Sequence, residues 1–120
     1  MEKRVLVLGA SEKPERYSNM AIKLLRRNNY PVEAVGLRKG KVGDVEIKDN
    51  LDEVSDIHTV TVYLGPKNQS PYYEFLPSLK PKRVIFNPGT ENDDLRNKLI
   101  EHGIEVVENC TLVMLNYDLF

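Results

Sequence analysis

Four consecutive apolar residues near the start of the chain, Val5–Leu8, constrain the fold more than any other feature. An apolar run of this length is typical of a strand buried on both faces, as in a parallel sheet. The run ends at Gly9-Ala10-Ser11, small residues that let the backbone turn sharply, and Ser18 is the expected N-cap of a following helix. A strand, a small turn and a helix N-terminus form a natural phosphate site, although an ordinary turn without a ligand fits equally well.

The rest of the chain alternates between β-prone segments and segments with helical periodicity. Further strands are expected over 32–35, 59–64, 83–86 and 104–107, and helices over 18–28, 70–79, 91–102 and 110–115. The alternation predicts one α/β domain over residues 1–120, a Rossmann-like fold with helices on both faces of the sheet. The simplest arrangement is a five-stranded parallel sheet of order 3-2-1-4-5, with a short extended piece over 45–47.

Composition narrows the class of partner. A net charge of −1 argues against binding to nucleic acid or to an anionic membrane surface. No apolar run approaches the roughly 18 residues that a membrane span needs, and the first strand begins too early to leave room for a signal peptide. The single cysteine, Cys110, cannot form an internal disulfide, so the cytoplasm is the expected compartment. A small-molecule ligand is the expected partner, with a protein partner or homodimer left open.

Small, amide, hydroxyl and basic residues follow the strands, whereas plain connections, with His58 and His102 among them, precede them. The carboxyl ends of parallel strands meet at one edge of the sheet, where ligands bind near the point at which strand order reverses. The sequence therefore favours a ligand site at this edge. The residues expected to form it are Gly9, Ala10, Ser11, Leu37, Arg38, Lys39, Gly40, Tyr63, Leu64, Asn87, Pro88, Gly89 and Thr90.

The residues after the first two strands indicate a class of nucleotide. A nicotinamide fingerprint would need G-x-G-x-x-G and an acid after the second strand, but only Gly9 is present and Arg38 and Lys39 follow that strand. Cations at this place suit a ribose phosphate, as in NADP or coenzyme A, and Arg16 supplies a guanidinium suited to a pyrophosphate. A solvated basic loop is the alternative interpretation, and the preferred one for Lys41.

Two segments resemble the small stand-alone coenzyme A-binding domain family, which is similar to the N-terminal domain of the succinyl-CoA synthetase α subunit. They are Gly9–Asn19, with its Pro14, Arg16, Tyr17 and Ser18, and Tyr30-Pro31-Val32 at the start of the second strand. The resemblance covers essentially the whole chain. It departs from the family pattern at Val35-Gly36-Leu37, where a Val-Asn-Pro-like segment is usual, and at Asn109, where a basic residue often precedes the cysteine.

The resemblance implies a protein that binds coenzyme A or an acyl-CoA. It assigns the phosphates to Gly9, Ala10, Ser11, Arg16 and Asn19. It assigns the phosphorylated ribose and the adenine side to Leu37, Arg38, Lys39 and Gly40. Tyr63, Leu64 and the turn of Asn87, Pro88, Gly89 and Thr90 would line the path of the adenine and pantetheine.

Catalysis is not expected. The candidate nucleophiles Ser11 and Cys110 follow strands, whereas both histidines precede them. A strand of five or six residues spans about 17–20 Å, so neither imidazole reaches as a base or shares a metal with the cysteine. The synthetase's phosphorylated histidine also has no counterpart. The alternatives are an NADP-binding oxidoreductase-like subunit, and an interaction module without a ligand that uses Tyr72-Tyr73 or Tyr117–Phe120.

Overall fold

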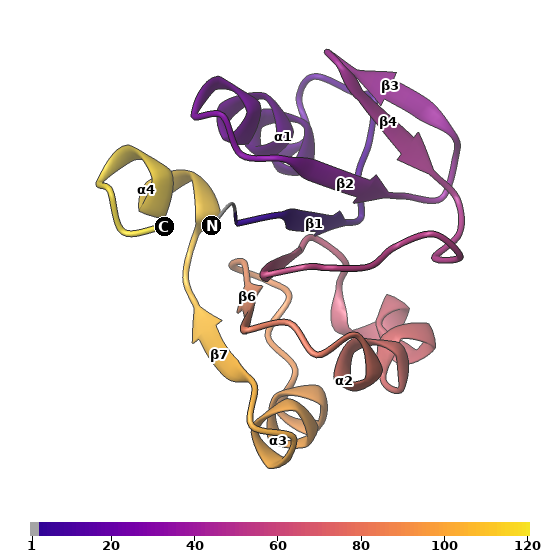
Figure 1. Cartoon of the computed structure of the whole chain (residues 1–120), viewed down its shortest axis with the longest axis vertical. Helices are drawn as coiled ribbons and strands as arrows, with labels where there is room; N and C mark the ends of the chain where they lie inside the picture. Colours follow the sequence, from indigo (N-terminus) through magenta and orange to yellow (C-terminus); the bar gives the residue numbers. More distant parts are fainter. Residues whose placement is uncertain (1–2) are drawn as a thin grey trace.

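A seven-stranded sheet forms the centre of the structure, a computed structural model that describes residues 3–120 (Figure 1). Its strands are β1 (Val5–Leu8), β2 (Val32–Val35), β3 (Gly40–Val42), β4 (Val45–Lys48), β5 (Thr59–Val62), β6 (Arg83–Phe86) and β7 (Glu105–Glu108). Their order is β3-β4-β2-β1-β5-β6-β7. All neighbouring strands are parallel except β3 and β4, which form an antiparallel hairpin at one edge.

The predicted α/β class and parallel arrangement are confirmed, but the five-stranded sheet of order 3-2-1-4-5 is wrong. The segment expected as a short extended piece is β4, which pairs in parallel with β2, and β3 folds back on it. With the outer side of β2 occupied, β5 pairs with β1 instead of lying at the edge. Counted in chain order, the six parallel strands follow 3-2-1-4-5-6, so the order reverses between β1 and β5.

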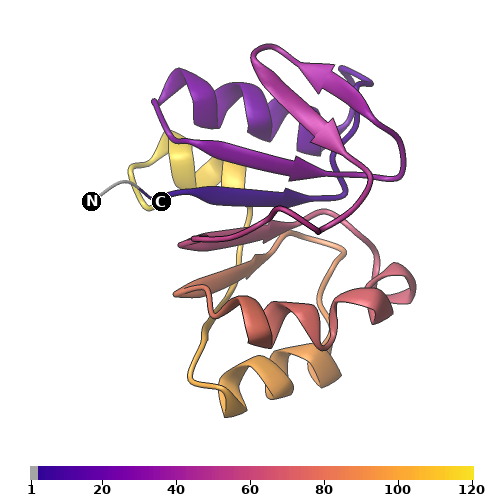
Figure 2. The same ribbon diagram turned by 45° about the vertical axis from the view of Figure 1, so that its right-hand side comes forward.

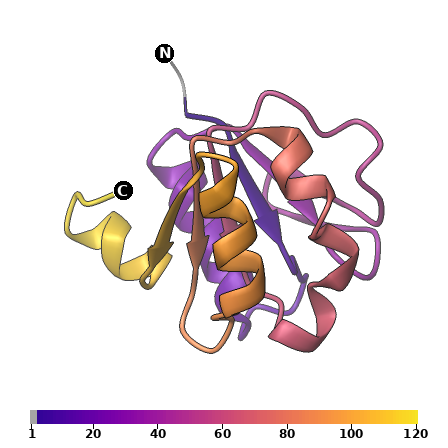
Figure 3. The same ribbon diagram turned by 90° about the horizontal axis from the view of Figure 1, so that it is seen from below.

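Two layers of helices cover the sheet, α1 and α4 on one face and α2 and α3 on the other (Figures 2 and 3). The helices are α1 (Tyr17–Arg27), α2 (Phe75–Leu79), α3 (Asp93–Glu101) and α4 (Thr111–Asn116), with short 3₁₀ turns η1 (Pro66–Asn68) and η2 (Ser70–Tyr72) before α2. The single helix expected from Ser70 is thus divided. No helix within residues 3–120 has the length and apolar character needed to cross a membrane.

The helix ends follow local chemistry in most places. Asn29 and Gly103 adopt positive φ just beyond α1 and α3, as expected of residues that end a helix. The α3 helix starts later than expected because the Asn92 side chain accepts a hydrogen bond from the Leu95 N–H and so caps it. Ser18 is not the N-cap of α1; Arg16 holds that position, and Ser18 is buried in the first turn.

The core has two parts, one on each face of the sheet. Within β1, Val5 and Val7 pack on the α1 and α4 side, while Leu6 and Leu8 pack on the α2 and α3 side. Successive side chains of a strand point to opposite faces, so a strand covered on both sides must be apolar throughout. All four side chains are at most 1% exposed, which confirms the interpretation of this run.

Candidate functional site

The turn after β1 lies against the end of β5, at the point where the strand order reverses. Gly9 has φ +88°, and a Cβ there would lie 3.0 Å from the Tyr63 carbonyl carbon and 3.2 Å from Leu64 Cδ2. Glycine is therefore needed both for the backbone conformation and for the close approach. Three residues predicted for the site, from two separate loops, are brought together here.

The same turn is tied to the end of β2. The N–H groups of Gly9 and Ala10 both donate to the Val35 carbonyl, at 2.9 and 3.0 Å. Neither group is free for a phosphate, contrary to what the sequence suggests for a strand-to-helix turn. The role of these two residues is to hold the β1 turn against β2. Gly36 assists, because a Cβ at that position would overlap the Ala10 carbonyl oxygen.

Further donors lie slightly further along, in the loop between the β1 turn and the start of α1. The N–H groups of Ser11 and Glu12 have no partner within residues 3–120, and α1 starts with no side-chain cap and no acidic residue in its first turn. Arg16, at the N-cap, has an exposed side chain outside every ion pair of the described residues. An uncapped helix N-terminus with an adjacent guanidinium is suited to an anion.

The buried side chain of Asn19 is hydrogen-bonded to the backbone of this loop. Its side chain is 2% exposed and donates from Nδ2 to the Ser11 carbonyl at 2.9 Å, while its Oδ1 has no partner among the described residues. The buried amide fixes the path of the Ser11 backbone. Asn19 is thus engaged in an internal hydrogen bond, and the phosphate contact that the resemblance assigns to it stays a prediction.

The loop after β2 carries the basic residues of the site. Leu37 is 94% exposed, and Arg38 and Lys39 are exposed and form no ion pair within residues 3–120. The loop leads from Gly36, which touches the β1 turn, into Gly40 at the start of β3. Two unpaired cations and an exposed apolar side chain thus lie beside the turn that carries the free N–H groups.

A buried glutamine that the sequence analysis missed connects the other two loops. Gln69 is 1% exposed, and its Nε2 donates to the carbonyls of Leu64 (2.8 Å) and Thr90 (2.7 Å). Its Oε1 accepts a hydrogen bond from Asn92 Nδ2 at 3.0 Å. Gln69 stands between two 3₁₀ turns in a polar stretch, where nothing in the local pattern indicates burial.

The turn after β6 is held by its own polar side chains. Asn87 Nδ2 donates to Thr61 Oγ1 and the Val62 carbonyl, and its Oδ1 accepts the Thr111 N–H at 2.9 Å. Thr90 Oγ1 donates to the Asn87 carbonyl at 2.7 Å. These two predicted site residues are buried and engaged internally. The exposed part of this turn consists of Pro88 and Gly89.

Tyr63 lies on the α1 and α4 side of the sheet with its hydroxyl buried and without a hydrogen-bond partner in the described part of the chain. Burial raises the pKa of Tyr63 to about 12, and the nearby hydroxyls of Thr61 and Thr111 oppose this shift only in part. Those two hydroxyls are bonded to each other at 2.8 Å. A phenol in this place stays neutral well above its ordinary range.

We expect the free energy of unfolding of Tyr63→Phe to fall less steeply than that of the wild type as pH rises above about 10. The unfolded chain releases the phenolic proton from about pH 10 and the folded chain from about pH 12, so this residue lowers the free energy of unfolding as pH rises between them, by up to about 3 kcal/mol. Removing the unpaired hydroxyl also relieves a buried polar group, so the melting temperature at pH 7 stays equal or rises by a few degrees. Urea unfolding across the alkaline range measures both effects. The exposed Tyr117 is the control: Tyr117→Phe leaves the alkaline slope unchanged, and an equal slope in both variants would contradict the prediction.

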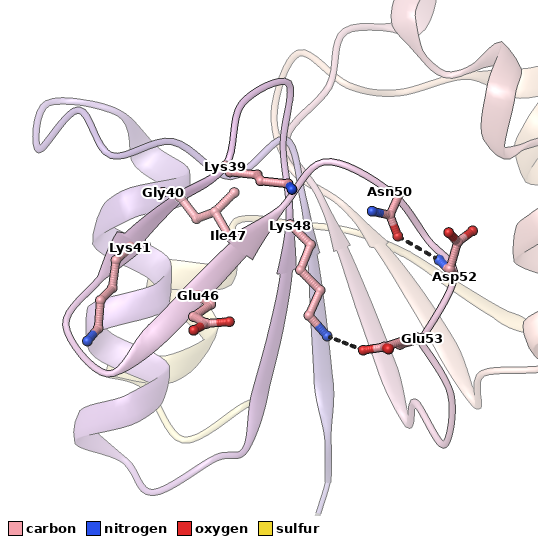
Figure 4. Close-up of a pocket in the computed structure, with 9 residues that line it drawn as sticks. All are labelled: Lys39, Gly40, Lys41, Glu46, Ile47, Lys48, Asn50, Asp52 and Glu53. Carbon is pink, nitrogen blue, oxygen red and sulfur yellow. Dashed lines mark hydrogen bonds and ion pairs between the residues drawn. The ribbon is translucent and has the colours of Figure 1, made fainter.

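An open hollow of about 570 Å³ lies beside the β3–β4 hairpin (Figure 4). It is lined by Lys39, Gly40, Lys41, Glu46, Ile47, Lys48, Asn50, Asp52 and Glu53. Lys48 Nζ lies 3.6 Å from Glu33 and 3.8 Å from Glu53, so its charge is balanced by one carboxylate outside the lining and one within it. Only Lys39 and Gly40 belong also to the predicted site. The mixed charge makes this hollow a poorer phosphate site than the start of α1.

Groups able to perform chemistry are separated. His58 directly precedes β5 and His102 ends α3, both at the edge opposite Ser11 and Cys110. Cys110 is a partly buried free thiol. Within residues 3–120, no three side chains of His, Cys, Asp or Glu are grouped so as to hold a metal ion.

Comparisons with known proteins point to one family. A family described as CoA binding domain matches residues 3–116. Among solved structures, the crystal structure of an uncharacterized protein is 43% identical, with a TM-score of 0.95, over 100% of this chain and 99% of that chain. A hypothetical protein from Pyrococcus horikoshii OT3 is 28% identical, with a TM-score of 0.86, over 98% of this chain and 84% of that chain.

A more distant structure, cell-free ID.343 from Thermus thermophilus, shares the fold at 24% identity, with a TM-score of 0.87, over 99% of this chain and 91% of that chain. No curated protein matches. The match over nearly the whole chain, together with the donors at the start of α1 and the basic loop after β2, leads to one conclusion. The chain belongs to the CoA binding domain family.

Proposed function

We propose that this protein binds coenzyme A or an acyl-CoA at the carboxyl edge of the sheet and does not itself catalyse a reaction. The observation that carries the proposal is the loop that leads to the uncapped start of α1: within residues 3–120, the N–H groups of Ser11 and Glu12 have no partner and the Arg16 guanidinium forms no ion pair. These donors suit a pyrophosphate, which carries two negative charges and many acceptor oxygens. Family membership supports coenzyme A as its source.

The loop after β2 supplies what the rest of the nucleotide requires. Arg38 and Lys39, which form no ion pair within residues 3–120, are cations suited to the phosphate on the ribose, and the exposed Leu37 offers an apolar surface to the adenine. Leu64, Pro88 and Gly89 border the other side, toward the pantetheine. NADP would meet the same cations, but its fingerprint requires two glycines after Gly9 that this chain lacks.

The non-catalytic part of the proposal is supported by the separation of nucleophiles from bases. Ser11 and Cys110 lie at the carboxyl edge and both histidines at the opposite edge. A nucleophile needs a base within hydrogen-bond reach, about 3 Å. We therefore propose a carrier, sensor or partner domain whose task is to hold the nucleotide.

A thermal-shift series tests the proposal. A ligand that binds only the native state at a hundredfold excess over its Kd adds about 2.7 kcal/mol to the free energy of unfolding. We expect the melting temperature to rise by several degrees with coenzyme A, and by clearly less with NADP at the same concentration. No shift with coenzyme A, or a larger one with NADP, would contradict the proposal. Incubation with acetyl-CoA, followed by mass spectrometry of the nucleotide, tests the absence of turnover.

A further inference from the structure

The carboxylate of Glu12 links two loops that lie far apart in the sequence. Its Oε2 accepts a hydrogen bond from the backbone N–H of Lys41 at 2.9 Å. Next to this bond lies Gly40, where a Cβ would come within 2.7 Å of Glu12 Oε1. The absence of a side chain at residue 40 is therefore what lets the Glu12 side chain lie across the start of β3. One end of this link is the turn that carries the free N–H groups, and the other is the basic loop.

The far end of the β3–β4 hairpin is anchored independently. Arg26 Nη2 and Nε donate to the Asp44 carboxylate at 2.8 and 3.0 Å, which fastens the hairpin turn to the last turn of α1. Val42 and Val45 are buried in the core beneath. The hairpin is thus held against α1 at its turn, and the Glu12 bond holds its beginning. Among the hydrogen bonds within residues 3–120, the Glu12 bond is the one that joins the backbone of residues 37–41 directly to the β1–α1 turn.

We propose that Glu12 is a positioning residue that sets the spacing between the pyrophosphate site and the cations that receive the ribose phosphate. The inference rests on the proposed function. A nucleotide that carries phosphates at both ends gains from both sites only if their separation is fixed before binding, because ordering a loop on binding costs free energy. Glu12 acts through the Lys41 backbone and does not contact the ligand. It thereby decides how well the protein distinguishes coenzyme A from 3′-dephospho-CoA.

The alternative is that Glu12 acts through its charge and weakens phosphate binding by electrostatic repulsion. The two roles are separated by Glu12→Gln, whose amide oxygen keeps an acceptor for the Lys41 N–H but removes the charge. If Glu12 positions the loop, Glu12→Gln retains the preference for coenzyme A over 3′-dephospho-CoA, and Glu12→Ala loses it. If Glu12 acts by repulsion, both substitutions tighten the binding of coenzyme A.

The experiment measures the Kd of coenzyme A and of 3′-dephospho-CoA by calorimetry for the full chain and its variants. We expect Glu12→Ala to reduce the ratio of the two affinities about tenfold, mainly by weakening coenzyme A, since a fixed cation–phosphate contact is worth about one order of magnitude. Gly40→Ala, which displaces the Glu12 side chain, has the same effect. Glu15→Ala, an exposed carboxylate of the same loop outside every hydrogen bond and ion pair of the described residues, leaves the ratio unchanged.

A second measurement does not depend on a ligand. Hydrogen exchange of the Lys41 amide should accelerate in Glu12→Ala and remain protected in Glu12→Gln, with the melting temperature of both near that of the wild type. An unchanged affinity ratio in Glu12→Ala, an equal loss of both nucleotides, or tighter binding in both Glu12 variants would overturn the inference. Failure of the wild type to bind coenzyme A at all would overturn the proposed function as well, so the two failures are distinguishable.

Discussion

Arg16→Ala should remove most of the rise in melting temperature that coenzyme A produces, while the protein without ligand melts within about one degree of the wild type. The side chain is exposed and forms no ion pair within residues 3–120, so the folded state loses little when it is truncated. A charge-assisted contact to a phosphate contributes about 1.5–3 kcal/mol, which corresponds to a ten- to hundredfold weaker affinity. Thermal shift and calorimetry at fixed salt measure the loss.

Arg27 provides the matched control, since it is an exposed arginine of the same helix, at the opposite end. Arg27→Ala makes the same change in net charge but lies away from the uncapped N-terminus, so it should leave the coenzyme A shift nearly intact. Arg16→Lys should fall between wild type and Arg16→Ala, because an ammonium retains the charge but not the fork of donors. A full shift in Arg16→Ala, or equal losses at both positions, would rule out the phosphate role of Arg16.

The largest effect on stability is expected from Phe120→Ala, at about 3 kcal/mol of the free energy of unfolding. Phe120 is 8% exposed, its ring meets Tyr30 edge-on with 5.1 Å between centroids, and the Arg83 guanidinium lies 4.5 Å above the ring centroid. Truncation leaves a cavity in the core on the α1 and α4 side of the sheet and removes both ring contacts. Urea unfolding monitored by circular dichroism gives the change directly.

The neighbouring Leu119 separates this effect from a general sensitivity of the C-terminal segment. Leu119 is 61% exposed, so Leu119→Ala should change stability by less than about 0.5 kcal/mol. The Phe120 carbonyl, which accepts hydrogen bonds from Lys3 Nζ (3.2 Å) and Arg83 Nη2 (3.0 Å), is present in both variants. If both substitutions cost the same, the anchoring of the Phe120 ring is not a source of stability.

Much of the fold was predictable because local chemistry dictates it. The unbroken apolar run of Val5–Leu8 is typical of a strand covered on both faces, and the structure shows such a strand. Asn29 and Gly103 end their helices in the left-handed conformation that few other residues adopt readily. Four of the five expected strands lie within a residue of their expected bounds, and the third ends two residues early, at Val62.

The main error of the sequence-based prediction was to miss the β3–β4 hairpin, and the reason is physical. Its strands contain three and four residues, and β4 places only Val45 and Ile47 in the core. Two apolar residues are too few for the alternating pattern of a strand to be recognised in the sequence. Its place beside β2 is decided by pairing with Ala34 and Val35, more than ten residues earlier in the chain. That pairing displaced β5 to the other side of β1 and changed the strand order.

At the site, residue types and their positions after the strands were enough to bring the β1 turn, the basic loop and the β5 end to one edge of the sheet. They could not show which polar groups remain free, because that depends on partners distant in sequence. The Val35 carbonyl takes the N–H groups of Gly9 and Ala10, and Glu12 reaches Lys41 across 29 positions. Hydrophobic periodicity and turn chemistry depend on residues that are neighbours in the sequence, so the sequence alone reveals them. Which polar groups find a hydrogen-bond partner depends on residues that only the folded chain brings together.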